Sequence, residues 1–379
     1  MLDLLSGIRV VDLTTVVLGP YATQMLADFG AEVIKVEPRG GDIFRSARPG
    51  HAGGDGAGFL NLNRNKKSIA LDLGKEEDKQ TLTALVATAD VFVHNIRRQS
   101  AAKLGIDFDT IRRWKPDIIY AWARGYGQGP YEDEPAYDDC IQAVSGLAWL
   151  NANENGEPRF VRTILCDKVA GLHLAFAIAA GLAARARSGE GCQVETPMYE
   201  TMASFLLIEQ LSGQTFIPAL PDRGYERLNA PGRKPYKTAD GYVAIMPYTS
   251  SHWLKFLKIV EEGALCATAW VRDSEQRSLR VAELYNVIEK HAAKRTTHDW
   301  LNCLRAADIP CAPVNKLEDL PADAQLLAGD LFRSFKHPRE GDLQYVSNPI
   351  TSRTADTLPD QPAPVLDADR ADILKQLKS

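Results

Sequence analysis

The sequence lacks several short motifs that would place it in a common class of protein. Six cysteines are present among 379 residues, and none belongs to a C-x-x-C pair, so zinc-binding and dithiol redox motifs of that type are absent. The opening residues MLDLLSGIRVVDL contain neither a basic start nor a long apolar run, so no secretory signal is predicted. We therefore expect a cytoplasmic protein whose thiols remain reduced.

Long apolar runs and an excess of positive charge are also missing. The most apolar stretch, 169–184, is shorter than the roughly 20 residues of a membrane-spanning helix, so we expect a buried helix and no membrane attachment. The 44 lysines and arginines are outnumbered by 49 aspartates and glutamates, which argues against nucleic acid as a partner. An apolar content of 45% suffices for a sizeable core without disulfides or a metal.

Strand-like and helix-like segments alternate through the first half of the chain. A buried strand at 7–13, a helix that Gly19-Pro20 opens and Gly30 ends, and a strand at 32–37 form one βαβ unit. The alternation predicts the α/β class, with an open, mainly parallel, Rossmann-like sheet. The further strands are expected at 68–73, 91–94 and 118–123, and the further helices at 76–87, 108–114, 137–150, 168–187 and 197–212.

The second half predicts a smaller domain and a returning tail. Residues 213–235 contain four prolines and several arginines without periodicity, and we assign a linker to 213–229. A strand at 242–245 and helices at 252–259, 281–291 and 298–306 predict a small α+β domain over 230–320. The proline- and aspartate-rich end is expected to run back over the first domain, so the large domain comprises 1–212 plus 321–379.

The first βαβ unit imitates a dinucleotide-binding fold but lacks its glycines. Glu37 follows Gly19 by 18 positions, yet the turn TTVVLGPY contains no G-x-G-x-x-G, so NAD binding is disfavoured. Three basic or amide-rich segments, 38–42, 63–67 and 95–98, lie near strand ends. Each alone is typical of a solvated turn, but together they could hold a phosphorylated, adenine-bearing ligand.

Asp167 precedes the apolar helix expected from about Lys168, and two interpretations are open. Its carboxylate could cap the helix, which stabilises a helix by about 1 kcal/mol. Alternatively, the helix N-terminus holds a poorly hydrated carboxylate as an anion that can act as a nucleophile. For an aspartate taken alone, the cap is the favoured interpretation.

Several long segments change that balance because they carry a family pattern. Nearly the whole chain resembles the class III CoA-transferases, the CaiB/BaiF family, and the resembling segments occur in the same order as in that family. The resembling segments are VDLTTVVLGPYATQMLADFGAEVIKVEPRGGD, NRNKKSIALDL, ADVFVHNIRRQSAAKLG, GYGQGP with YDDCIQAVSG, DKVAGLHLAFAIAAGLAAR, SGEGCQVETPMYE, TADGYVAI and IPCAPVNKLEDL.

The resemblance implies a reaction on Asp167. This carboxylate would attack a donor thioester to give a mixed anhydride, and the CoA thiolate would then form an aspartyl-CoA thioester that passes CoA to an acceptor acid. Coenzyme A or acyl-CoA is then a substrate, and no tightly bound cofactor, ATP or metal is expected. Arg39 and Lys103 would pair with phosphates, and Tyr137 would lie near the thioester. The positions matching family CoA contacts are Val16, Arg39, Lys66, Asn95, Lys103 and Tyr137.

The resemblance also implies a homodimer of interlocked chains.

The sequence departs from the family pattern at several positions. Val17 stands where formyl-CoA transferases have glutamine, and 246–251 replaces their run of glycines, which disfavours formyl-CoA and oxalate as substrates. The family's 2-methylacyl-CoA racemases need a histidine where this chain has Tyr137 and its neighbours. Tyrosine, with a usual pKa of about 10, is a poor replacement, so a transferase is favoured and a racemase is the alternative.

Two questions stay open at this level. A non-catalytic protein that binds CoA or a nucleotide is a third hypothesis. Four arginines could hold a second carboxylate of a dicarboxylic substrate such as succinyl-CoA, although ordinary surface charge explains each of them as well. These are Arg45, Arg48, Arg124 and Arg162.

Overall fold

The structure, a computed structural model, describes residues 1–221 and 226–378. Contacts divide the chain into one unit of Met1–Leu206 with Ala324–Ser379 and a second unit of Leu207–Asp323. The sequence predicted 1–212 plus 321–379 for the first, and a linker at 213–229 before the second. Residues 222–225 of that linker lie outside the described part of the chain.

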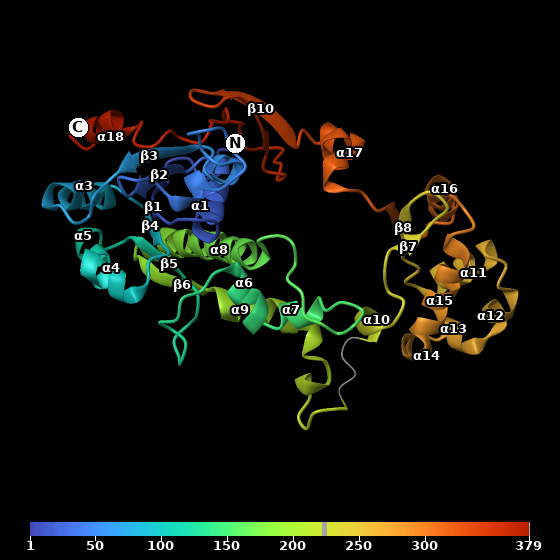
Figure 1. The fold of residues 1–379 in the computed structure, drawn as a ribbon. Helices are drawn as coiled ribbons and strands as arrows, with labels where there is room; N and C mark the ends of the chain where they lie inside the picture. Colours follow the sequence, from blue (N-terminus) through green and yellow to red (C-terminus); the bar gives the residue numbers. More distant parts are fainter. Residues whose placement is uncertain (222–225, 379) are drawn as a thin grey trace. The chain divides into compact units, whose positions relative to one another are not determined.

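The first unit is built on a six-stranded parallel sheet in the order β3-β2-β1-β4-β5-β6, which confirms the predicted fold class (Figure 1). The strands are β1 Arg9–Leu13, β2 Glu32–Glu37, β3 Lys66–Ala70, β4 Val91–His94, β5 Ile119–Arg124 and β6 Cys192–Pro197. Strand β6 was not predicted. It is an edge strand of which only Thr196 is fully buried, so its sequence lacks the apolar run of an inner strand.

Helices cover both faces of this sheet because its strands alternate their side chains between two cores. Val10 packs with α1 and α8 in one core, whereas Val11 packs with α3 and α5 in the other. The helices of the first unit are α1 Leu18–Asp28, α2 Ala57–Leu62, α3 Glu76–Ala87, α4 Arg98–Leu104, α5 Phe108–Trp114, α6 Asp138–Val144, α7 Leu147–Leu150, α8 Leu165–Ser188, α9 Met198–Gln210, α17 Ala324–Ala328 and α18 Arg370–Gln376, with a short 3-10 helix at Ile43–Ser46.

The C-terminal chain returns to the edge strand β3 (Figure 1). The Asp369 carboxylate accepts a hydrogen bond from the Ser68 N–H at 2.8 Å, and the Asp367 carboxylate accepts one from the Ala70 N–H at 2.7 Å. These bonds satisfy backbone donors that an edge strand otherwise leaves open. A hairpin of β10 Phe332–His337 and β11 Gly341–Val346 belongs to the same returning segment.

The second unit packs helices on a three-stranded antiparallel sheet in the order β7-β8-β9. Its core contains Trp253, Phe256 and Trp300. The elements are α10 Glu226–Asn229, β7 Tyr236–Lys237, β8 Tyr242–Ile245, α11 Ser250–Ile259, α12 Gly263–Ala267, α13 Ala269–Arg272, α14 Ser274–Leu279, α15 Val281–Ala292, α16 Thr297–Ala306 and β9 Cys311–Pro313, with 3-10 helices at Ser212–Thr215 and Leu317–Ala322.

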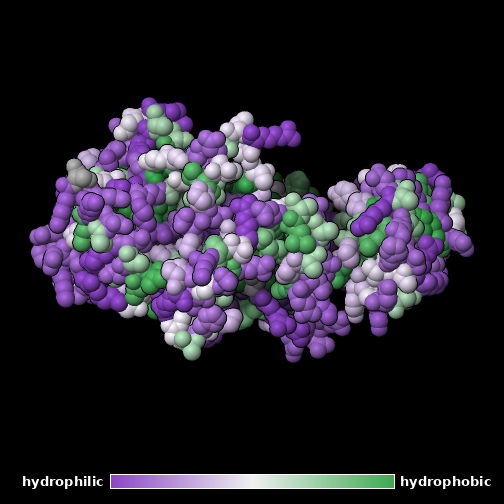
Figure 2. All heavy atoms as spheres, turned by 90° about the horizontal axis from the view of Figure 1, so that it is seen from above, coloured by the Kyte–Doolittle hydropathy of each residue, from purple (hydrophilic) through white to green (hydrophobic). Residues whose placement is uncertain are grey.

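Helix α8 is both a core helix and a source of exposed apolar surface. Among the described residues it is the one helix that is long and apolar enough to cross a membrane, a test that the buried helix of a globular domain also passes. Leu174 and Ile178 lie in the core, whereas 75% of Phe176 is exposed. Ile208 of α9 is 83% exposed, and Figure 2 shows apolar side chains at the surface among hydrophilic ones.

Helices α8 and α1 approach so closely that only glycine fits at their crossing. A Cβ at Gly171 would lie 2.7 Å from the Leu18 carbonyl oxygen, a backbone atom that cannot turn aside. This contact fixes the start of α8 against the start of α1. The residues that begin the two helices are thereby held next to one another.

Gly171→Ala tests this packing. Alanine is normally better than glycine inside a helix by roughly 0.5–1 kcal/mol, but here we expect a loss of about 1–3 kcal/mol, because the added methyl overpacks the crossing. Thermal unfolding measures it as a lower Tm. The matched control is Gly181→Ala, whose Cβ would meet an Ile119 methyl at 3.0 Å, a group that can shift. A Gly171→Ala protein at least as stable as the control would contradict the close contact.

Candidate active site

Two pockets lie at the carboxyl ends of the parallel strands, where ligands of open α/β sheets collect. Strand order reverses beside β1, since β2 and β4 lie on its two sides. A pocket of about 130 Å³ contains Asp167, and a larger one of about 500 Å³ lies beyond Thr15, which lines both. Segments that follow the six strands supply most of the two walls. The structure therefore brings four of the predicted site residues together in the smaller pocket, namely Val16, Asn95, Tyr137 and Asp167.

Asp167 lies inside the first turn of α8, which begins at Leu165, three residues earlier than predicted. The N-cap position belongs to Ile164, which makes no side-chain cap bond, so the interpretation of Asp167 as the cap is wrong. The Asp138 carboxylate takes that role from α6. Its Oδ1 accepts hydrogen bonds from the N–H groups of Cys166 at 2.6 Å and Asp167 at 3.1 Å.

The environment of Asp167 disfavours its anion. The residue is only 7% exposed. Burial, and then the charge of Asp138, raise the pKa of the Asp167 carboxyl from 3.8 to about 7. Cys166 is a poor rival nucleophile, because burial raises the pKa of its thiol to about 12. With a pKa of about 7, a substantial share of Asp167 is an anion at neutral pH, and burial leaves this anion weakly hydrated.

Asp138 is a functional candidate that sequence reasoning missed. It is buried at the start of α6, and its Oδ2 accepts a hydrogen bond from Gln142 Nε2 at 2.6 Å. Gln142 Oε1 in turn accepts from the Val161 N–H, in the segment that leads to α8. The signal in the sequence was the pair of acidic residues directly after Tyr137. From the sequence we related this position only to the histidine of the racemases and assigned no role to the carboxylates.

The segment between β1 and α1 forms the opposite wall and carries backbone strain. Val16 has a φ of 70°, a left-handed conformation that costs a β-branched residue about 1–3 kcal/mol. Asn95 holds Thr15, the residue before Val16, through two hydrogen bonds. The Thr15 N–H donates to Asn95 Oδ1 at 3.1 Å, and Asn95 Nδ2 donates to the Thr15 carbonyl at 3.0 Å. Asn95 therefore supports this wall as well as lining the pocket.

The N-terminus of α1 opens toward the same pocket. Its N-cap, Val17, makes no side-chain cap bond, and Leu18 lines the pocket. The N–H groups that begin a helix have no partner within it, and they carry a partial positive charge. Val17 is 3% exposed and apolar, so it offers no polar group where formyl-CoA transferases have glutamine.

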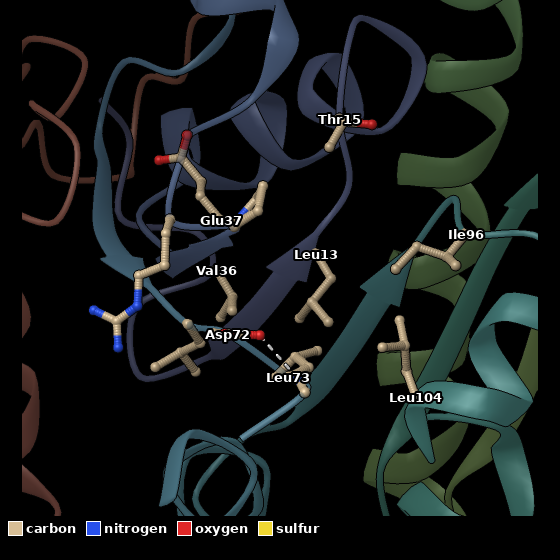
Figure 3. Close-up of a pocket in the computed structure, with 12 residues that line it drawn as sticks. Leu13, Thr15, Val36, Glu37, Asp72, Leu73, Ile96 and Leu104 are labelled. Atoms are coloured by element: carbon tan, nitrogen blue, oxygen red, sulfur yellow. Dashed lines mark hydrogen bonds between the residues drawn. The ribbon is translucent and has the colours of Figure 1, made fainter. Parts of the chain in front are cut away.

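The larger pocket is apolar and has charged residues at its edge. Figure 3 shows Leu13, Val36, Leu73, Ile96 and Leu104 around it. Arg39 also lines it, and its guanidinium donates to Asp78 at 2.7 Å while half of the side chain stays exposed. Lys103 is exposed on α4, next to Leu104. Tyr137, 63% exposed, lies in the wall of the smaller pocket.

Lys66, like Lys103, lines neither of the two pockets. Its Nζ is fully buried and donates to the Pro20 carbonyl at 3.0 Å, Thr23 at 2.8 Å and Asn63 at 2.9 Å. It also pairs with Asp12 at 3.3 Å, and burial lowers its pKa to about 8. The Lys66 side chain therefore supports the interior below the strand ends, and it does not point at a phosphate.

The four arginines considered for a second carboxylate fall into two groups. Arg45 pairs with Glu37 at 2.8 Å and Asp55 at 3.0 Å, and Arg124 pairs with Glu195 at 2.9 Å and Glu132 at 3.4 Å. Arg48 and Arg162 are exposed. The Glu37 carboxylate is held by Arg45 and is thus not free to bind a ribose, which agrees with the absent dinucleotide motif.

Comparison with known proteins places this chain in a family. The model of CoA-transferase family III matches residues 5–370. Succinyl-CoA:glutarate CoA-transferase of Mus musculus is 31% identical over 98% of this chain and 86% of its own length. Formyl-CoA:oxalate CoA-transferase of Afipia carboxidovorans is 30% identical over 96% and 90%. A CaiB/BaiF family protein of Brucella suis has a similar structure, with a TM-score of 0.83, 28% identity and 100% of both chains covered.

The chain therefore belongs to CoA-transferase family III, and the predicted family is confirmed.

The raised pKa of Asp167 predicts a pH-dependent stability. Its carboxyl has a pKa of about 7 in the fold and 3.8 as its usual value, so the stability that the neutral form supports is complete below pH 3.8 and is lost as the pH rises to about 7. Asp167→Asn stays neutral. Its stability relative to the wild type should grow by about 2–3 kcal/mol between pH 5 and pH 8.

Thermal unfolding at both pH values measures this difference. Asp139→Asn, which changes an exposed carboxylate on the same helix as Asp138, is the control and should show a constant difference. A flat response of Asp167→Asn would mean that this carboxyl titrates normally.

Proposed function

We propose that this protein transfers CoA from an acyl-CoA donor to a free carboxylic acid through covalent intermediates on Asp167. The observation that carries the proposal is the buried carboxyl, with its pKa near 7, in a pocket beside an apolar cavity large enough for part of a CoA molecule. Proximity and weak hydration compensate for the low nucleophilicity of a carboxylate.

The proposed reaction begins with attack of an Asp167 oxygen on the thioester carbonyl carbon. The C–S bond breaks, which gives an aspartyl mixed anhydride and CoA thiolate. The thiolate then attacks the aspartyl carbonyl carbon, and the anhydride C–O bond breaks to release the donor acid. An acceptor carboxylate reverses both steps and leaves with CoA. No proton, ATP or metal is consumed in this sequence.

The start of α1 supports the charged stages of this reaction. Each attack places negative charge on a former carbonyl oxygen. The first N–H groups of α1, at Leu18 and Gly19, have no partner within the helix and begin beside the pocket. Helix N-terminal donors of this kind stabilise a developing oxyanion without reorganisation. In the proposal they take the place of the missing glutamine side chain at Val17.

The larger pocket supports the binding of the CoA body. Its apolar walls suit an adenine ring or the pantetheine arm, and Arg39 and Lys103 provide charge for phosphates. The relatives named above act on glutarate and oxalate, both dicarboxylic acids. We propose a dicarboxylic acid longer than oxalate as a substrate. Its second carboxylate would meet Arg48 or Arg162, because Arg45 and Arg124 already have carboxylate partners.

We also propose a homodimer. Phe176 on α8 and Phe205 on α9, both in the first unit, support this proposal, because they are large apolar side chains that are 75% and 52% exposed, and exposed apolar surface marks association sites. The dimer places no residue in the reaction as proposed here.

Asp167→Ala should reduce CoA transfer by about 10³-fold or more, because the nucleophile is lost. A matrix of acyl-CoA donors against free acids, read by liquid chromatography, identifies the substrates first. Mass spectrometry of the wild type during turnover should then find CoA or an acyl group on Asp167, and hydroxylamine should trap it. Asp139→Ala should retain activity.

Retained transfer in Asp167→Ala would disprove the proposal. Exchange of the α-proton of a 2-methylacyl-CoA in deuterated water, without CoA transfer, would instead indicate the racemase. Binding of CoA without any turnover would indicate a binding protein.

Lys103→Gln tests the phosphate contact. We expect the KM for acyl-CoA to rise about tenfold while kcat and the KM for the acceptor acid stay nearly unchanged, because a charge-assisted hydrogen bond contributes about 1.5–3 kcal/mol. The control is Lys375→Gln, an exposed lysine on α18. An unchanged KM would remove Lys103 from the CoA site.

A further inference from the structure

A buried ion pair lies directly beneath the strained wall of the smaller pocket. Lys35 of β2 and Asp42 meet with Nζ 3.0 Å from Oδ2, and both side chains are completely buried. Lys35 also donates to the Thr14 carbonyl at 2.8 Å. Asp42 is fixed from the other side, because its N–H donates to Glu37 at 2.9 Å and its Oδ1 accepts from the Phe44 N–H at 2.9 Å.

This pair holds the one pocket residue whose backbone is strained. The Val16 N–H donates to Asp42 Oδ1 at 3.2 Å and to Oδ2 at 3.3 Å. Val16 has a φ of 70°, a conformation that a β-branched residue adopts only when its surroundings impose it. The pair therefore fixes the backbone on both sides of Thr15. Lys35 donates a hydrogen bond to the Thr14 carbonyl, and Asp42 accepts one from the Val16 N–H.

Stability does not explain either the buried ion pair of Lys35 and Asp42 or the left-handed conformation of Val16. An apolar pair of similar volume often stabilises a fold as well as, or better than, a buried ion pair does. A left-handed valine adds a cost that glycine would remove. Strain that the surroundings enforce occurs mainly at functional sites, and this strained residue lines the pocket that contains Asp167.

We propose that Lys35 and Asp42 are positioning residues for CoA transfer: their ion pair holds Val16 in its left-handed conformation, so that 15–18 forms a rigid wall opposite Asp167. The inference rests on the proposed function for its kinetic part. In this arrangement the start of α1 and the thioester site keep their places relative to the Asp167 carboxylate. Loosening the wall lowers the rate of attack more than it lowers the affinity for acyl-CoA.

The first test measures strain and does not depend on activity. In an ordinary backbone position alanine is more stable than glycine, because it restricts the unfolded chain. At position 16 we expect the reverse, with Val16→Gly melting at a higher temperature than Val16→Ala. The matched pair is Ala177→Gly in α8, which should melt below the wild type. If Val16→Ala is more stable than Val16→Gly, position 16 is unstrained and the inference is wrong.

The second test asks whether the ion pair acts through Val16. Asp42→Asn should lower the single-turnover rate of adduct formation on Asp167 by tenfold or more, with the KM for acyl-CoA changed less than threefold. In a Val16→Gly background, where the conformation needs no enforcement, the same Asp42→Asn change should cost less than threefold. Lys67→Met, which breaks the surface pair with Glu32, is the control and should leave the rate unchanged.

A third variant covers the case in which Asp42→Asn leaves Lys35 as an unpaired buried charge and the protein fails to fold. The double variant Lys35→Met with Asp42→Asn buries no charge and should fold. Its rate should fall by tenfold or more relative to the wild type, whereas in the Val16→Gly background the same double change should alter the rate of Val16→Gly by less than threefold. An equal loss of rate in both backgrounds would overturn the positioning role. Absence of CoA transfer in the wild type itself would refute the proposed function, while the melting comparison at position 16 would still stand.

Discussion

The site depends on which carboxylate takes the backbone donors at the start of α8. Asp138 accepts the N–H groups of Cys166 and Asp167, so the anion that the helix N-terminus stabilises is Asp138 and not Asp167. Asp167 is left buried beside a like charge. Had Asp167 been the cap, the same helix would have lowered its pKa and made it an inert structural anion. One hydrogen-bond arrangement thus separates a carboxylate that caps the helix from one whose pKa is raised.

The parallel sheet brings this carboxylate to the edge at which both pockets lie. Thr15 lines both pockets because it follows β1, the strand at which the strand order reverses. The crossing of α1 and α8 at Gly171 then holds Asp167 close to the segment that follows β1. Sheet order sets the location of the site, and the close helix crossing at Gly171 holds its two sides together.

The sequence was sufficient for the parts of the structure that repeat a regular pattern. Alternating strands and helices predicted the sheet, whereas the role that the family segments indicate for Asp167 stays a prediction. Strand β6 was missed because an edge strand has little apolar signal. The start of α8 and the role of Asp138 were missed for a different reason. They follow from two hydrogen bonds from Asp138 to the start of α8. These bonds span 28 and 29 positions of the sequence, a separation that no local pattern encodes. Lys66 was expected at the CoA site because it matches a family position, and its burial follows from hydrogen bonds to Pro20 and Thr23, which lie more than 40 positions away in the sequence.

A pKa near 7 has a consequence for the direction of the proposed reaction. The CoA thiolate can attack either carbonyl carbon of the mixed anhydride. Attack on the donor carbonyl expels the Asp167 carboxylate and returns the starting thioester, whereas attack on the aspartyl carbonyl expels the donor acid. A simple carboxylic acid has a usual pKa of about 4 in water, so a donor acid that departs toward water is a better leaving group than the buried Asp167, whose pKa is near 7. The burial that makes Asp167 a stronger nucleophile therefore also favours the productive cleavage of the anhydride.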